Sequence, residues 1–193
     1  MFKIYGDSIS GNCLKAKYTA DYLNLPYEWH EIDILNQESR TPEYLAMNPF
    51  GQVPIMQLED GEVITQSNAI IRYIAHVSTL LPQDRLKQAK IDEWLYWEQY
   101  SHEPYIAVNR FQMRYLNKSV DELDDWRVQR GNEALDFMDN FLKDNQWLAN
   151  NAFSVADISL YAYTSMAEEG GFILKTRANL VRWLEECRME LDL

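Results

Sequence analysis

Three side chains with reactive or hydrogen-bonding groups lie close together near the start of the chain. Ser10, Asn12 and Cys13 belong to the segment SISGNCLK, which runs from Ser8 to Lys15. The segment joins a short β-prone run to a helical stretch, so it lies at the carboxyl end of a strand, where open α/β sheets tend to bind ligands. We expect a hydroxyl, an amide and a thiol to face one point there, although small polar residues in such a loop also serve as plain helix caps.

Cys13 supports two interpretations. It is a small residue packed in the first turn of the helix, or it is a reactive thiol, because a helix N-terminus and the nearby Lys15 both lower a thiol pKa. The second cysteine, Cys187, is far away in sequence, so neither a CxxC pair nor a disulfide framework is available. The three histidines stand alone, so we expect no metal site.

The Val53-Pro54 pair interrupts a run with strand character. Proline cannot donate to a β-ladder. The pair therefore marks an edge strand or a bulge, or a cis peptide bond that opens the strand. In the cis interpretation the backbone N–H and C=O of Val53 stay free to pair with a peptide-like ligand.

Gln66-Ser67 lies where a strand passes into a helix. Ser67 is the expected N-cap of that helix, a role that needs no function. The helix N-terminus is nevertheless an anion site with a positive dipole end, and Gln66 adds an amide that donates and accepts. The pair suits a ligand that carries an amino-acid head group.

The elements that position these groups alternate before residue 79. Strand patterns cover Phe2–Tyr5, Tyr27–Ile32, Val53–Leu58 and Val63–Thr65, and helical patterns cover Cys13–Asn24, a short segment capped by Thr41-Pro42, and the segment after Ser67. The order β-α-β-α-β-β-α predicts a right-handed βαβ unit completed by a hairpin and a helix. We therefore expect a thioredoxin-like domain with a mixed four-stranded sheet over residues 1–78.

The pattern becomes helical after a linker at residues 79–86, which includes TLLPQD. Helical stretches cover 87–116, 121–144, 154–169 and 179–190, and Pro104 is expected to kink the first of them. Ser154 and Asp157 have the spacing of a capping box, which we interpret as structural. Residues 87–193 are therefore predicted to form an all-α domain.

Composition excludes several classes of function. The chain has 193 residues, of which 47% are hydrophobic and 25% charged, and its formal net charge is −12. That charge argues against binding to nucleic acid or to anionic lipid. No apolar run approaches the roughly 18 residues of a membrane span. Because no signal peptide is visible and cysteines are few, we expect a cytoplasmic protein.

Several of these motifs together resemble a known family. The stretch NPFGQVPIMQLEDGEVITQSNAIIRYIA (Asn48–Ala75) resembles the glutathione-binding half of cytosolic glutathione transferases, and FSVADISL (Phe153–Leu160) resembles the capping box of their second domain. The ordered set covers essentially the whole chain and is most similar to bacterial, serine-type members, theta- or nu-like. The resemblance implies a thioredoxin-like domain followed by a helical domain, and a homodimer.

The resemblance also implies a glutathione site. Val53, before a cis Pro54, would pair through its backbone with the cysteinyl part of glutathione. Gln66 and Ser67 would hold the γ-glutamyl carboxylate and amine.

Three neighbouring residues complete the implied site. Gln52 would lie near the ligand backbone, and Arg40 would meet the glycyl carboxylate. Phe50 occupies the segment in which several classes carry an aromatic key that inserts into the partner subunit, so it is the candidate dimer contact.

The family also implies a catalytic hydroxyl in the first loop. Serine-type members point to Ser10, and an Asn two residues later in some bacterial relatives points to Asn12. A hydroxyl that donates to the bound thiolate favours the ionised form. Lowering a thiol pKa by about two units needs roughly 2.7 kcal/mol. Lys15, Lys17 and Arg40 are nearby cations, although the lysines are equally well explained as a solvated helix face.

The electrophile is expected in an apolar cleft lined by the first long helix. Its candidate lining residues are Tyr100, Tyr105, Asn109 and Phe111. The implied activity is that of a glutathione transferase, which activates the glutathione thiolate for attack on a small hydrophobic electrophile. The alternatives are a glutathione-dependent peroxide or disulfide reductase, a glutathione-dependent isomerase or dehalogenase, and a non-catalytic interaction module on the same fold.

Overall fold

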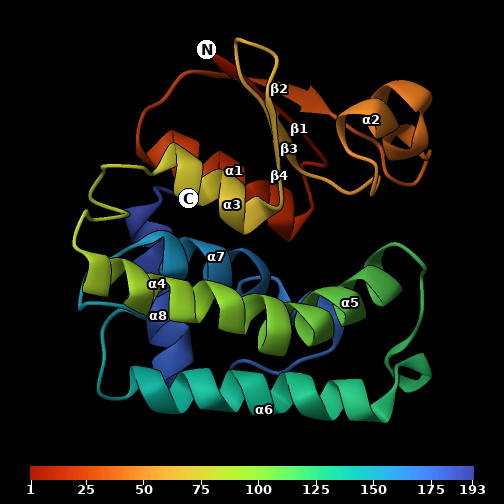
Figure 1. The fold of residues 1–193 in the computed structure, drawn as a ribbon. Helices are drawn as coiled ribbons and strands as arrows, with labels where there is room; N and C mark the ends of the chain where they lie inside the picture. The colour runs from red at the N-terminus through yellow and green to blue at the C-terminus, as the bar shows by residue number, and fades with distance from the viewer. The chain divides into compact units, whose positions relative to one another are not determined.

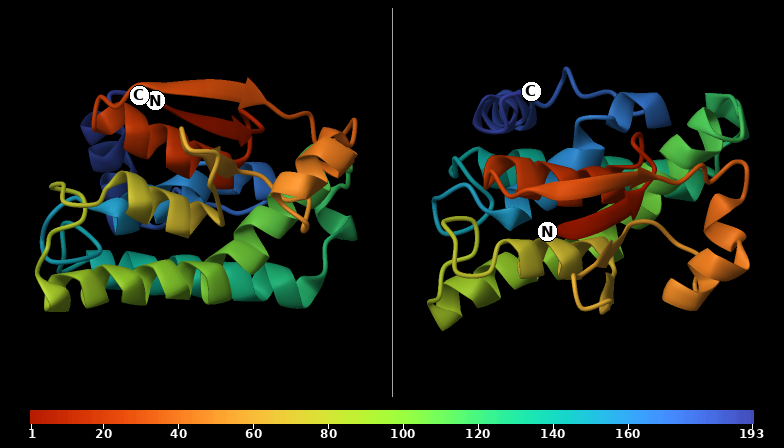
Figure 2. Two further views of the ribbon diagram at one scale, coloured as in Figure 1. Left: turned by 45° about the horizontal axis from the view of Figure 1, so that its top comes forward. Right: turned by 90° about the horizontal axis from the view of Figure 1, so that it is seen from above.

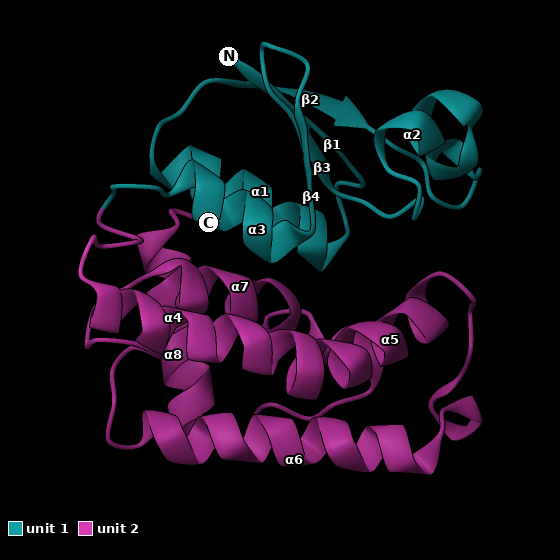
Figure 3. Ribbon diagram, viewed as in Figure 1, with its two compact units in different colours: residues 1–78 teal, residues 79–193 magenta.

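The computed structural model describes residues 1–193 and divides the chain into two compact units. Unit 1 is Met1–Ser78 and unit 2 is Thr79–Leu193 (Figure 3). The predicted fold class is confirmed, because unit 1 has the thioredoxin-like arrangement and unit 2 is helical. No helix in either unit is both long enough and apolar enough to cross a membrane.

Unit 1 is built around a mixed sheet with the strand order β2-β1-β3-β4 (Figure 1). The strands are β1 (Phe2–Gly6), β2 (Tyr27–Glu31), β3 (Ile55–Gln57) and β4 (Val63–Thr65). In β1, Ile4 lies opposite Trp29 of the parallel strand β2 and opposite Met56 of the antiparallel strand β3. The predicted βαβ unit and hairpin therefore form one continuous sheet.

Two helices, α1 (Gly11–Tyr22) and α3 (Ser67–Ile74), lie side by side on one face of this sheet (Figures 1 and 2). Their apolar faces and the sheet share one buried core, made of Ile4, Ala16, Ala20, Met56, Ile70 and Ile74. Burial of each larger side chain is worth about 1.5–3 kcal/mol, so this core fixes α1 against α3.

The short helix α2 (Pro42–Met47) lies apart from that pair (Figure 1). Its start follows the sequence signals, because Pro42 is at the first helical position and the N–H of Tyr44 donates to Oγ1 of Thr41 at 3.3 Å. A single 3₁₀ turn, Glu38–Arg40, precedes it.

Unit 2 contains five α-helices: α4 (Arg85–Trp97), α5 (Glu103–Arg114), α6 (Asp125–Leu142), α7 (Val155–Thr164) and α8 (Ala178–Glu190). The helix predicted over 87–116 is divided, because a π-helical segment, Glu98–His102, joins α4 to α5. Pro104 lies two residues beyond this segment, in the first turn of α5. Its ring nitrogen has no hydrogen to donate to the carbonyl four residues earlier, which disturbs the α-helical ladder at the expected place. Further 3₁₀ turns lie at Val120–Glu122 and Ala167–Gly170.

Helix α7 is buried along its whole length. Its capping box is confirmed, since the N–H of Ser154 donates to Asp157 at 3.0 Å and the N–H of Ala156 donates to Oγ of Ser154 at 3.2 Å. Asp157 also accepts from the N–H of Leu148 and from Nε1 of Trp183, each at 3.0 Å. One carboxyl group therefore links α7 to the preceding loop and to α8.

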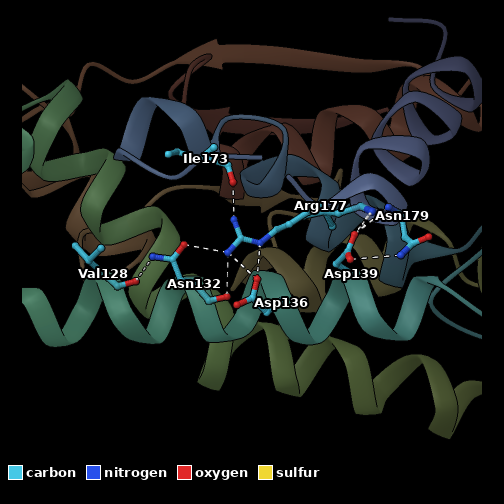
Figure 4. A network of polar contacts seen from close by, with 8 residues as sticks. Val128, Asn132, Asp136, Asp139, Ile173, Arg177 and Asn179 are labelled. Carbon is cyan, nitrogen blue, oxygen red and sulfur yellow. Dashed lines mark hydrogen bonds and ion pairs between the residues drawn. The ribbon is translucent and has the colours of Figure 1, made fainter. Parts of the chain in front are cut away.

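A polar network joins α6 to the start of α8 (Figure 4). The buried guanidinium of Arg177 donates to Oδ1 of Asp136 at 2.7 Å and to Oδ1 of Asn132 at 3.0 Å. One turn further along α6, Asp139 accepts from the main-chain N–H of Asn179 at 2.9 Å. Asp139 thereby caps α8, whose own N-cap residue makes no side-chain capping bond.

Candidate functional site

The two N-terminal helix ends that the sequence singled out meet at one point of unit 1. The hydroxyl of Ser67 donates to Oδ1 of Asn12 at 3.0 Å, although the two residues are 55 positions apart. Nζ of Lys15 donates to Oγ of the same serine at 3.5 Å. The structure therefore brings together the segment Ser8–Lys15, which carries Cys13, and the Gln66-Ser67 pair.

The start of α3 differs from the prediction. Ser67 is the first helical residue rather than the N-cap, and Gln66 takes the capping position without a side-chain capping bond. The reason is that the Ser67 hydroxyl bonds to Asn12 instead of to its own helix. Gln66 has φ +70°, a conformation that non-glycine residues rarely adopt, and such residues cluster at functional sites. Gln66 is exposed and its side chain makes no capping bond, so its amide is available to a ligand.

Ser10 is half-buried at the N-cap position of α1, and its side chain makes no capping bond. Its hydroxyl lies beside the thiol of Cys13, which is completely buried and accepts from the N–H of Asp7 at 3.3 Å. Burial raises the pKa of Cys13 to about 12, although the Ser10 hydroxyl and the Asp7 N–H favour the thiolate. The packed-residue interpretation of Cys13 is therefore supported, and thiol exchange through this residue is disfavoured.

The Val53-Pro54 peptide bond is cis, as predicted. Val53 precedes β3, and no hydrogen bond within the chain uses its main-chain groups. The carbonyl of Gln52 accepts from the hydroxyl of Tyr44 and from Nδ2 of Asn48, each at 2.8 Å. These two side chains hold the segment that leads into Val53. Neither side chain carries a local signal in the sequence that marks it as part of a site.

Arg40 and Phe50 lie together at the neighbouring turn. Nη1 of Arg40 donates to the carbonyl of Phe50 at 2.9 Å. At Gly51, φ is +60° and an added Cβ would lie 2.5 Å from the same Nη1, so this turn requires glycine. The Phe50 side chain is 69% exposed, which leaves it free for an intermolecular contact.

The three expected cations have different surroundings. Lys15 is fully buried, so the solvated-face interpretation is wrong for it. Lys17 is half-buried and pairs with Asp21 at 2.7 Å and with the Tyr27 hydroxyl at 3.3 Å, so its ammonium is directed elsewhere. Arg40 is exposed. Of the two lysines, only Lys15 belongs to the cluster around Ser67, which consists of Ser67, Asn12 and Lys15.

The four candidates for the electrophile pocket do not gather in one place. Tyr100 and Tyr105 line a pocket of about 300 Å³ within unit 2, beside α6. Its other lining residues are Trp97, Ser101, Arg130, Glu133, Ala134 and Phe137. Asn109 is fully buried and neither side-chain polar atom has a hydrogen-bond partner, while Phe111 stacks on Tyr115 with ring centroids 5.0 Å apart. Asn109 and Phe111 do not line this pocket.

Comparison with known proteins identifies the family of this chain. The glutathione S-transferase N-terminal domain family matches residues 9–77, and the C-terminal domain family matches residues 102–190. A crystal structure of a glutathione S-transferase from Pseudomonas fluorescens is 41% identical, with a TM-score of 0.93, and the match covers 97% of this chain and 94% of that one. The chain belongs to the glutathione S-transferase family.

Two curated relatives show the range of this glutathione S-transferase family. Glutathione S-transferase 3 of Zea mays is 29% identical over 195 residues, covering 95% of this chain and 87% of the relative. Elongation factor 1-gamma 3 of Oryza sativa is 25% identical over 150 residues, covering 76% of this chain and 36% of that protein. Glutathione is the co-substrate of this family.

Proposed function

We propose that this chain is a glutathione transferase that binds glutathione at the cluster around Ser67 and activates its thiol with the hydroxyl of Ser10. The observation that carries the proposal is the hydrogen bond between Ser67 and Asn12. It joins the motif suited to an amino-acid head group to the loop suited to a thiolate. A single extended ligand can therefore reach both.

The ligand groups are assigned by their chemistry. Gln66 and the start of α3 would hold the γ-glutamyl amine and carboxylate, because a helix N-terminus offers free N–H donors and a positive dipole end. The main chain of Val53 would pair with the cysteinyl part in the manner of a β-strand. Gln52 would lie along the ligand backbone, and Arg40 would meet the glycyl carboxylate.

Thiol activation is assigned to Ser10, with Asn12 as its neighbour in the loop. The thiolate is the nucleophile that attacks a small hydrophobic electrophile, and a thiol is mostly protonated at neutral pH. The Ser10 hydroxyl already lies beside one sulfur atom, that of Cys13, so it can donate to sulfur from this position. Together with the N-terminus of α1, such a donor stabilises a thiolate held in front of the loop.

Glutathione binding by calorimetry tests this assignment, with the wild type beside Ser67→Ala and Ser10→Ala. The expected result is binding by the wild type, loss of binding with Ser67→Ala, and retained binding with Ser10→Ala. Conjugation of a small aromatic electrophile should then be impaired in Ser10→Ala. Absence of binding at millimolar glutathione would contradict the proposal.

A second candidate function is a non-catalytic interaction module. It is favoured by the similarity to elongation factor 1-gamma 3, which this chain matches over 150 residues. The same calorimetry separates the two functions. A wild type that binds glutathione and turns over an electrophile is an enzyme, and one that does neither is an interaction module.

We further propose that the protein is a homodimer in which Phe50 contacts the partner subunit. The exposed Phe50 ring is held on a rigid turn, since Arg40 fixes its carbonyl and the next residue must be glycine. We assign the binding site of this ring to the partner's copy of the unit 2 pocket, whose lining includes the aromatic residues Trp97, Tyr100 and Phe137.

A further inference from the structure

Lys15 is a buried lysine in the first turns of α1, at the point where α1 and α3 meet. Its side chain is fully buried, and its ammonium donates to Oγ of Ser67 at 3.5 Å. The same hydroxyl donates a hydrogen bond to Oδ1 of Asn12 at 3.0 Å. Ser67 is therefore held from both sides, by a cation and by an amide oxygen.

The charge of Lys15 lies where the protein excludes water, so its field is screened less than that of a surface lysine. The chain as a whole carries −12, so an anionic ligand meets a repelling protein at long range. The start of α3 has the opposite local character. The N-termini of α1 and α3 and the ammonium of Lys15 place three sources of positive potential around one serine oxygen.

We propose that Lys15 is a positioning residue for glutathione, which acts through Ser67 to supply the positive charge for the γ-glutamyl carboxylate. This inference rests on the proposed function, because it assigns a role within the same site. Its ammonium fixes the Ser67 oxygen, and its charge offsets the ligand carboxylate at the N-terminus of α3. Neither task needs contact with the reacting sulfur.

The test compares two ligands that differ in one carboxylate. Glutathione is the first, and the second is its analogue in which 4-aminobutanoyl replaces the γ-glutamyl residue. Affinities are measured by calorimetry for the wild type, Lys15→Met and Lys17→Met. The control removes the same charge from the same helix, but from a side chain that pairs with Asp21 and Tyr27.

For Lys15→Met the affinity for glutathione should fall by about ten- to a hundredfold, the size of a charged hydrogen bond. The affinity for the analogue should change by less than about twofold, as should both affinities in Lys17→Met. Under turnover conditions KM for glutathione should rise while kcat stays nearly constant. A lysine with a purely structural role would affect both ligands equally, and that result would overturn the inference.

A measurement on the wild type removes dependence on the folding of the variant. The side-chain ammonium signal of Lys15, followed by ¹⁵N NMR, should shift on addition of glutathione and stay in place with the analogue. Equal responses to both ligands, or to neither, would overturn the inference while leaving glutathione binding established. A wild type that binds neither ligand would refute the proposed function itself.

Discussion

Ser10 stands at the start of α1 with its hydroxyl next to a sulfur atom. Replacing it by alanine removes one charge-assisted donor, worth about 1.5–3 kcal/mol. The thiol pKa of bound glutathione should therefore rise by about one to two units. The measurement is the ultraviolet absorbance of the thiolate in the complex as a function of pH.

Ser8→Ala is the matched control for that titration. Ser8 is an exposed serine of the same loop, and its main-chain N–H, which alanine retains, donates to Glu31 at 2.8 Å. It should leave the titration of bound glutathione unchanged. An unchanged titration in Ser10→Ala as well would show that another group stabilises the thiolate.

Cys13 should be inert in the folded protein. Burial raises its pKa to about 12, so the thiol is almost entirely protonated at neutral pH. Cys187 is buried too, and burial also raises its pKa. A disulfide reagent should therefore label the native protein slowly and react with both thiols once the chain is unfolded in urea. Rapid labelling in the native state, located at Cys13 by peptide mass spectrometry, would restore its reactive interpretation.

The sequence identified the segments that come together in the candidate site, but not the contacts between them. Gln66 and Ser67 were identified because a strand-to-helix junction carries free N–H groups whatever its surroundings. The prediction that Ser67 is the N-cap of α3 was wrong, because its hydroxyl donates to Asn12 on another helix. Such a contact depends on how α1 and α3 pack, and no local pattern contains that information.

At the scale of the elements, Gly131 on α6 tests packing against helix propensity. Alanine is favoured over glycine by about 1 kcal/mol inside a helix. A Cβ at Gly131, however, would lie 2.4 Å from the ring of Phe172, and overpacking typically costs about 1–3 kcal/mol. Gly131→Ala should therefore lower the free energy of unfolding by up to about 2 kcal/mol, measured by urea denaturation. Gln129→Ala, at an exposed position of the same helix, should change it by less than about 0.5 kcal/mol. A gain in stability for Gly131→Ala would show that Phe172 moves freely.

The capping box of α7 predicts a pH dependence of stability. Burial raises the pKa of Asp157 from 3.8 to about 6, although hydrogen bonds from Leu148, Trp183 and Ser154 oppose the shift. The folded state therefore binds the extra proton between these two pH values. The stabilisation from this group is complete only well below the unfolded pKa of 3.8 and is lost as the pH rises through about 6.

The measurement is the difference in unfolding free energy between the wild type and Asp157→Asn. From about pH 4 to about pH 7 the wild type should lose about 2 kcal/mol relative to the variant. Asp144→Asn, which changes an exposed carboxyl group, should show no such trend. A difference that increases with pH would mean that the donors around Asp157 outweigh its burial.

The order of the elements followed from periodicity, and their boundaries did not. Alternating and helical patterns identified all four strands and the long helices, because each pattern records which face of an element is buried. The π-helical segment Glu98–His102 was anticipated only as a kink at Pro104. The missing N–H predicts that the ladder is disturbed, but whether the chain bends or widens there depends on the packing of the flanking helices.

At the scale of the whole molecule, net charge argues against some classes of partner but does not describe the candidate site. The formal charge of −12 acts at long range and argues against nucleic acid and anionic lipid. The buried Lys15 and the two helix ends act over a few ångströms, where the average over the surface has no influence. An acidic chain with a small basic centre suits a small anionic ligand rather than an extended one.

The proposed homodimer gives the last prediction. Phe50 is 69% exposed on a turn fixed by Arg40. In a twofold-symmetric dimer each residue contributes twice, so losing one aromatic contact of about 1.5–3 kcal/mol per subunit weakens association by about 3–6 kcal/mol. Sedimentation velocity at micromolar concentration should show a dimer for the wild type and a monomer for Phe50→Ser. Leu35→Ser replaces a similarly exposed apolar residue of unit 1 and should remain dimeric. A wild type that sediments as a monomer would refute the dimer, and a dimeric Phe50→Ser would place the interface elsewhere.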